Sequence, residues 1–198
     1  MSKVLFVGFN IDKKKLTFIS IIIMIIIFLG NLFVSTEYNL AAIFLSGGGN
    51  LVDYLGITKN DVFESWQLYR LITYGFTQSS IIHLLANITA LWFVGGFFES
   101  NIGRLKGVIL YLIGLILPGC LLIVIYPNSL NYGASPAIFA YIGVLVNWAL
   151  REKSLWRKYK EQIGAGYVAG YFFLSNVIGV AKLLLPVCRL YIPVQEQT

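Results

Sequence analysis

The chain has little charge and few of the residues that carry out acid and base chemistry. Only 12% of its 198 residues are Asp, Glu, Lys or Arg, whereas 58% are hydrophobic and the mean hydropathy is +0.77. Soluble domains carry about 25% charged residues, so the composition excludes an ordinary soluble domain. The sequence therefore predicts an all-α integral membrane protein.

Histidine and cysteine are almost absent. The two cysteines, Cys120 in an apolar span and Cys188 near the end, lack the spacing of a metal site or a disulfide framework. The one histidine, His83, has no cysteine or helical carboxylate partner. We therefore expect no metal and no cofactor. The net charge of +6 lies in short clusters beside apolar spans, which predicts no nucleic-acid partner.

Five apolar segments are long enough to be transmembrane helices. The first could be a signal peptide, but its length and the lack of a nearby small-residue cleavage site favour an uncleaved anchor. Beyond Lys182, two prolines and an arginine interrupt the apolar character. We thus expect a cytoplasmic N-terminus at 1–15, a membrane domain at 16–182 and an irregular tail at 183–198. The five segments are 16–34, 81–98, 107–126, 135–150 and 163–181.

Charge in the connections predicts the orientation. The connection at 151–161 is clearly positive, whereas the long first loop at 35–80 is negative. Positive loops stay in the cytoplasm, so the N-terminus is expected there, in a multi-pass protein of the plasma membrane if the source is bacterial. By parity, His83 and Ser135 then both lie near the outer face.

Three polar residues at helix starts are candidates for a site. His83 and Asn87 are four apart and share one helix face, and Ser135 begins another apolar helix just after Gly133. Polar side chains inside a membrane are functional-site hypotheses because burying them is costly. Simpler interpretations stay open: Ser135 as a helix cap, and His83 with Asn87 as interhelical hydrogen bonds.

Residues 69–143 resemble the core of the rhomboid family of intramembrane serine proteases. Four motifs in the family's order carry the resemblance: Tyr69-Arg70-Leu71-Ile72-Thr73, His83-Leu84-Leu85-Ala86-Asn87, the series Gly95, Glu99 and Gly103, and Gly133-Ala134-Ser135. The resemblance implies a rhomboid-like helical bundle that cleaves transmembrane segments of other membrane proteins. It implies Ser135 as nucleophile, an oxyanion hole made by His83, Asn87 and the Ser135 backbone N–H, and motif residues of structural importance at Arg70, Glu99, Gly103 and Gly133.

The chain departs from the family in three ways. Gln78 stands where a histidine is common, and Pro136 stands where glycine usually follows the serine. More seriously, the family's catalytic base lies in an Ala-His-x-x-Gly motif on a sixth helix, whereas here only five spans are expected and no histidine follows His83. Truncation, frameshift and true loss are alternative explanations. Because losing a triad member costs about 10⁴ to 10⁶ in turnover, this polypeptide is expected to be almost inert.

Three classes of function remain open. The first is a rhomboid-type serine endopeptidase without its base, and the second is a rhomboid-like pseudoprotease that binds transmembrane segments without cutting them. The third, an unrelated small membrane protein, is disfavoured because Glu99, at a span end, is the only carboxylate in the spans. In the first two classes the expected partners are transmembrane substrates and the lipid bilayer; the oligomeric state stays open.

Overall fold

The computed structural model describes residues 14–34, 43, 49–164, 166–167 and 169–171. In this part all secondary structure is helical apart from one isolated bridge between Ile57 and Asn131, so the expected all-α class is confirmed. The elements are α1 (Lys15–Val34), α2 (Asn50–Leu55), η3 (Asn60–Glu64), α3 (Arg70–Thr73), η4 (Tyr74–Phe76), α4 (Ile81–Ala90), η5 (Leu91–Gly95), α5 (Gly96–Ile102), α6 (Arg104–Ile125), α7 (Ser135–Arg151) and α8 (Lys153–Gln162).

Within the described residues, three continuous helical stretches are long and apolar enough to cross a bilayer. They are α1, the joined elements α4, η5 and α5, and α6. The 17 residues of α7 extend about 25 Å at 1.5 Å per residue, close to the roughly 30 Å of hydrocarbon. The predicted fifth span at 163–181 and the tail at 183–198 lie largely or wholly outside the described residues. These helices lie where the sequence predicts them and support an integral membrane protein.

Gly103 separates the second and third spans. Its φ of +97° lies in the left-handed region that favours glycine, and it ends α5 and precedes α6. The second span therefore continues to Ile102 rather than ending at 98, and the third begins at Arg104 rather than 107. Pro118 lies inside α6 without ending it.

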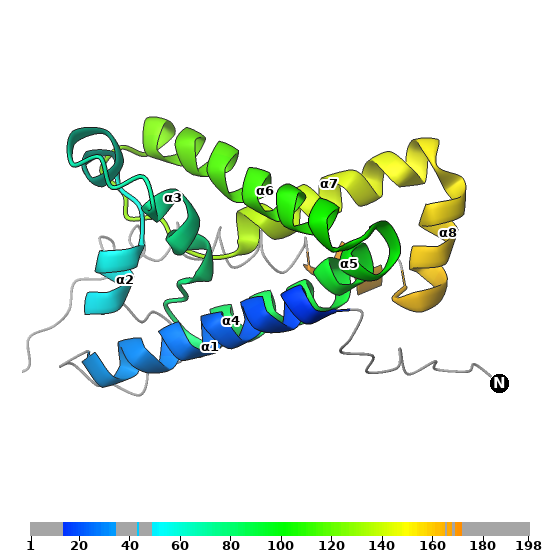
Figure 1. Ribbon diagram of the computed structural model, residues 1–198, viewed down its shortest axis with the longest axis horizontal. Coiled ribbons are helices and arrows are strands. Elements are labelled where there is room, and N and C mark those ends of the chain that lie inside the picture. Colours follow the sequence, from blue (N-terminus) through cyan, green and yellow to red (C-terminus); the bar gives the residue numbers. More distant parts are fainter. Residues whose placement is uncertain (1–13, 35–42, 44–48, 165, 168, 172–198) are drawn as a thin grey trace, which may run out of the picture.

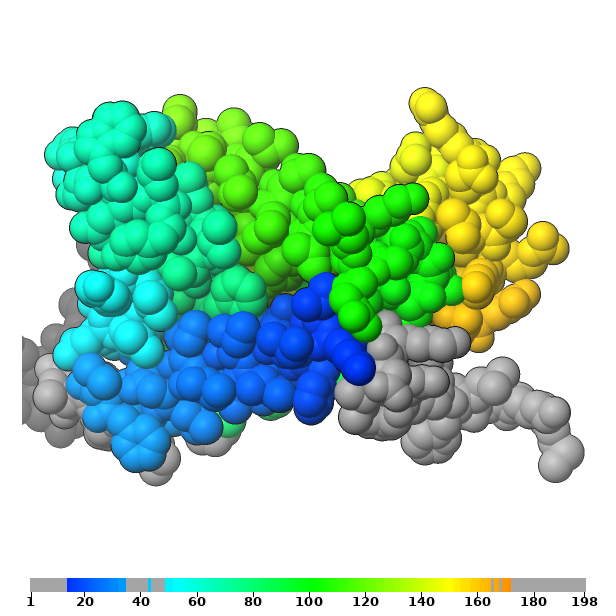
Figure 2. Space-filling view, viewed as in Figure 1, coloured from blue at the N-terminus to red at the C-terminus, as the bar shows by residue number. Residues whose placement is uncertain are grey.

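The long helices lie along one axis of the molecule, and α8 runs across one end of the bundle (Figure 1). Figure 2 shows the first-loop elements in cyan and teal at one end, and α8 in yellow and orange at the other. The described part of the negatively charged first loop and the basic connection after α7 are thus at opposite ends, as alternating spans require.

The first loop is held by a buried arginine. The Arg70 Nη1 donates to the carbonyl oxygens of Asp53 and Gly56, both at 2.8 Å, and lies 3.5 Å from the Asp61 carboxylate. A guanidinium carries five N–H donors in a fixed plane, so one side chain can join several turns of the loop. Glu64, the other acidic residue of η3, is exposed.

Glu99 joins α5 to the start of α1 at the other end. Its carboxylate accepts hydrogen bonds from the backbone N–H groups of Leu16 (2.9 Å) and Thr17 (2.8 Å) and from the Thr17 hydroxyl (2.9 Å). The Arg104 Nε lies 3.3 Å from the same carboxylate. Burial lowers the pKa of nearby Lys14, whereas the charge of Glu99 acts to raise it. A carboxylate at a helix N-terminus satisfies otherwise unpaired backbone donors, so Glu99 fixes the position of α1.

Candidate functional site

Ser135 and Asn87 lie side by side although they are 48 residues apart. The Ser135 Oγ donates a hydrogen bond to the Asn87 Oδ1 at 3.1 Å. Ser135 is the first residue of α7 and is followed by a proline, which fits the first turn because its missing N–H would have no helical partner. Asn87 lies in α4 and is buried, with 1% of its surface exposed.

His83 lies one turn before Asn87 on α4, and its ring packs against Gly133. The Ser80 Oγ accepts a hydrogen bond from the His83 backbone N–H at 3.2 Å and so begins the helix. A Cβ atom on Gly133 would lie 2.7 Å from the His83 Cε1 and 2.9 Å from its Nε2. Gly133 also has a φ of +115° and donates its N–H to the Tyr74 carbonyl at 2.8 Å. Only glycine permits this backbone to approach the histidine so closely.

Two further polar side chains reach the Asn87 amide. The Asn87 Nδ2 donates to the Gln78 Oε1 at 2.8 Å, and the Tyr171 hydroxyl donates to the Asn87 Oδ1 at 2.9 Å. Gln78 is fully buried, and its Nε2 has no hydrogen-bond partner within the part of the chain that the structure describes. The Asn87 oxygen therefore accepts from both Ser135 and Tyr171, while its nitrogen keeps one hydrogen beyond the bond to Gln78.

Among the described residues the arrangement has donors for a negatively charged oxygen, and the Ser135 hydroxyl is hydrogen-bonded to an amide rather than to a basic group. An amide oxygen accepts a hydrogen bond without taking the proton at neutral pH, so Asn87 orients the Ser135 hydroxyl but does not activate it. The first N–H groups of α7 are unpaired helix donors, and the helix dipole favours negative charge at this end. In the described residues no three His, Cys, Asp or Glu side chains are grouped so that they could hold a metal ion.

Sequence reasoning brought together Ser135, His83 and Asn87 but missed Tyr171. The only available signal was its spacing, because Tyr171 precedes the polar Ser175 by four residues on the predicted fifth helix. Ser175, Asn176 and Lys182 lie outside the described residues. Arg70, Glu99 and Gly103 lie away from Ser135, in the loop and helix contacts described above.

Comparison with known proteins identifies relatives of this chain. Residues 65–186 match the family described as the rhomboid domain, which covers more than half of the chain. The chain is similar to Rhomboid-like protease 3 of Toxoplasma gondii, with 30% identity over 123 residues, 60% of this chain and 47% of that protein. Rhomboid-type serine protease 2 of Yarrowia lipolytica is 29% identical over 100 residues, 48% of this chain and 33% of that protein.

A further relative is named as inactive rather than as a protease. Inactive RHOMBOID-like protein 8 of Arabidopsis thaliana is 24% identical over 123 residues, 62% of this chain and 34% of that protein. The chain thus spans less than half the length of these curated relatives.

Proposed function

This chain belongs to the rhomboid family, and we propose that Ser135 is the nucleophile of a rhomboid-type intramembrane serine endopeptidase site. Within these 198 residues no histidine follows His83 to act as its base. The observation that supports the proposal most strongly is the hydrogen bond of 3.1 Å between the Ser135 hydroxyl and Asn87, next to His83. The substrates of such a site are transmembrane segments of other membrane proteins, and the 198-residue chain is expected to turn them over barely, if at all.

In the proposed reaction the Ser135 Oγ forms a bond to the carbonyl carbon of a substrate peptide. The carbonyl oxygen becomes negatively charged and is stabilised by the His83 ring, the second Asn87 Nδ2 hydrogen and the Ser135 backbone N–H. Collapse of this intermediate breaks the C–N bond, and the leaving nitrogen takes up a proton. A base near Ser135 is needed to take the hydroxyl proton, and its protonated form then gives that proton to the leaving nitrogen. Water hydrolyses the remaining acyl-enzyme and restores the Ser135 hydroxyl. No histidine follows His83 in the sequence.

A second function has a specific observation in its favour. A chain with an intact oxyanion arrangement and no base is suited to bind a transmembrane segment without cutting it, as a pseudoprotease. The relative named an inactive rhomboid-like protein is consistent with this alternative. Proteolysis requires a histidine-bearing sixth helix, whereas binding without cleavage does not. Reading the DNA around the Lys182 codon in all three frames distinguishes them.

Both functions predict that the chain forms a complex with an intact transmembrane segment. We expect a reporter substrate with a photoreactive group near its outer end to cross-link to residues near Ser135 and Asn87 in proteoliposomes, with little product. Ser135→Ala should leave the cross-link unchanged, because a small hydroxyl contributes little to binding a whole helix. A cross-link confined to the outer surfaces of α1 and α6, identified by mass spectrometry, would contradict both functions.

The proposed orientation places the N-terminus and α8 in the cytoplasm and the first loop outside. A single cysteine at position 55, in a chain with Cys120 and Cys188 replaced, should react with a membrane-impermeant maleimide in intact cells, because the first loop is negative. A cysteine at the exposed position 158 of α8 should react only after lysis. The reverse pattern would overturn the orientation and place Ser135 near the cytoplasmic face.

A further inference from the structure

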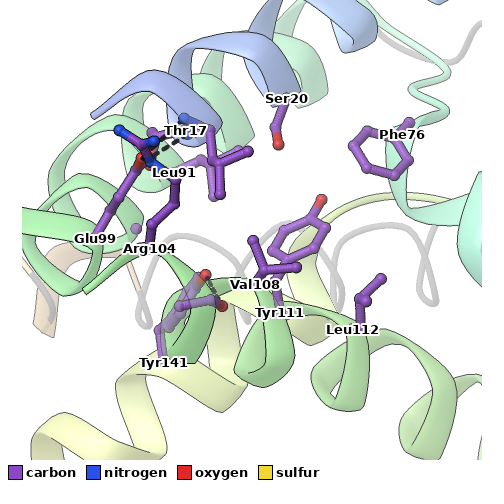
Figure 3. A pocket seen from close by; sticks show the side chains of 13 residues that line it. Thr17, Ser20, Phe76, Leu91, Glu99, Arg104, Val108, Tyr111, Leu112 and Tyr141 are labelled. Atoms are coloured by element: carbon purple, nitrogen blue, oxygen red, sulfur yellow. Dashed lines mark hydrogen bonds and ion pairs between the residues drawn. The ribbon is translucent and has the colours of Figure 1, made fainter. Parts of the chain in front are cut away.

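A cavity of about 170 Å³ lies between α1 and α6, apart from the Ser135 site. The hydrogen bonds described above join none of its lining residues to Ser135 or His83. Ser20 and Thr17 of α1 face Val108, Tyr111 and Leu112 of α6 across it (Figure 3). Leu16, Ser20, Val108 and Leu112 are only half-buried, so the cavity opens between two helices that face lipid.

The cavity contains one polar group without a partner. The Tyr111 hydroxyl is buried and has no hydrogen-bond partner among the described residues, and it points across the cavity toward Ser20 (Figure 3). Two neighbouring tyrosines differ from it: Tyr141 donates to the Gly107 carbonyl at 2.8 Å, and Tyr74 donates to the Leu115 carbonyl at 2.7 Å. Buried hydroxyls are nearly always paired, so Tyr111 indicates an acceptor that enters the cavity from outside the chain.

The polar end of the cavity is basic. Arg104, the first residue of α6, lines this end with a half-exposed side chain, and Lys15 and Lys106 are exposed nearby on the flanking helix starts. The one carboxylate of the lining, Glu99, is buried. It accepts hydrogen bonds from the N–H groups of Leu16 and Thr17 and is paired with the Arg104 Nε at 3.3 Å. Among the described residues that line this end, a ligand therefore meets the half-exposed Arg104 guanidinium and no exposed carboxylate.

We propose that this cavity binds one anionic glycerophospholipid from the leaflet on the Arg104 side of the membrane. Its phosphate lies at Arg104, an ester carbonyl accepts a hydrogen bond from the Tyr111 hydroxyl, and an acyl chain follows the apolar side of Val108 and Leu112. This binding is independent of the Ser135 chemistry. It also accounts for the buried Tyr111 hydroxyl, which has no hydrogen-bond partner among the described residues.

The dimensions fit such a ligand. Arg104 and Tyr111 are seven residues apart, about 10 Å along α6, and helical side chains lean back toward the helix N-terminus. Both side chains lean the same way, so the Tyr111 hydroxyl lies deeper in the membrane than the Arg104 guanidinium, as lipid ester groups lie beneath their phosphates. A volume of 170 Å³ holds roughly six water-sized groups at about 30 Å³ each. That is enough for the ester region and the first methylenes, while the chain ends stay in the bilayer.

Lipid retention by the full chain tests the proposal. The protein is reconstituted in equal phosphatidylglycerol and phosphatidylcholine, extracted in mild detergent and analysed by native mass spectrometry. We expect one phosphatidylglycerol to remain bound. Tyr111→Phe should lower its retention about fivefold, the effect of one hydrogen bond. The matched control Tyr126→Phe, on an exposed tyrosine after α6, should change nothing.

Lipid selectivity tests the role of Arg104 separately. Arg104→Gln should lower the ratio of bound phosphatidylglycerol to phosphatidylcholine more than Lys106→Gln does, because the exposed Lys106 side chain does not line the cavity. Equal effects of the two variants would show that surface charge alone attracts the lipid and would overturn the proposal. So would wild-type retention by Tyr111→Phe, or a wild-type protein that carries no lipid. Circular dichroism on each variant confirms that its helices are intact.

Discussion

Extending the chain with a sixth helix that carries Ala-His-x-x-Gly is expected to raise cleavage of a reporter transmembrane substrate by at least about 10⁴-fold. The Ser135 hydroxyl is already oriented by Asn87, and His83 already lies against Gly133, so the reaction lacks mainly a group that takes the proton. Single-turnover rates in proteoliposomes, with the 198-residue chain as reference, measure the gain.

Two variants of the extended chain test the cause of that gain. Ser135→Ala should abolish it, because no other nucleophile is proposed. Asn87→Ala should reduce it by about 10² to 10³, the usual effect of removing one oxyanion donor. Robust Ser135-dependent cleavage by the 198-residue chain would contradict the account and direct attention to Lys182 or Asn176 as catalytic groups.

Replacing Gly133 by alanine is expected to have the second-largest effect. The φ of +115° is strained for any residue with a Cβ, at a cost of about 1–3 kcal/mol, and the new methyl group would lie within 3 Å of the His83 ring. Either the loop or the histidine must move. A displacement of about 1 Å at a catalytic group costs on the order of 10²-fold in rate. Thermal unfolding and cleavage by the extended chain measure the two effects.

Gly143 provides a matched control for this substitution. It lies within α7, and a Cβ atom there would have no neighbour within 4 Å. Gly143→Ala should therefore leave cleavage unchanged and keep or slightly raise the unfolding temperature, since alanine is the better helix former. If Gly133→Ala and Gly143→Ala behave alike, the close approach of Gly133 to His83 has no importance for the site.

The helices were predictable where one physical signal dominates. The continuous apolar run at 16–34 nearly coincides with α1, and the segment at 135–150 nearly coincides with α7, because exclusion of water sets both bounds. The segment at 151–161, predicted only as a basic connection, contains α8 in the structure. The ring of Tyr159 packs on Phe97 with centroids 5.2 Å apart. That contact depends on how the helices pack, which charge counts do not reveal.

The candidate site was predictable in part for similar reasons. Helical spacing places His83 and Asn87 on one face, and parity places Ser135 at the same side of the membrane. Their proximity came only from the family resemblance, because nothing local relates residues 48 apart. The contact of Tyr171 with Asn87 depends on the rotation of the fifth helix about its axis, so a single sequence could not predict it.

The most direct test of the central claim is which serine reacts with an organophosphonate probe. Mass spectrometry of the labelled, extended chain identifies the adduct, with the 198-residue chain treated in parallel. The expected result is an adduct on Ser135 in the extended chain and almost none in the shorter one, because only a deprotonated hydroxyl attacks the phosphorus. An adduct on Ser79 or Ser80 instead, or equal labelling of Ser135 in both chains, would contradict it.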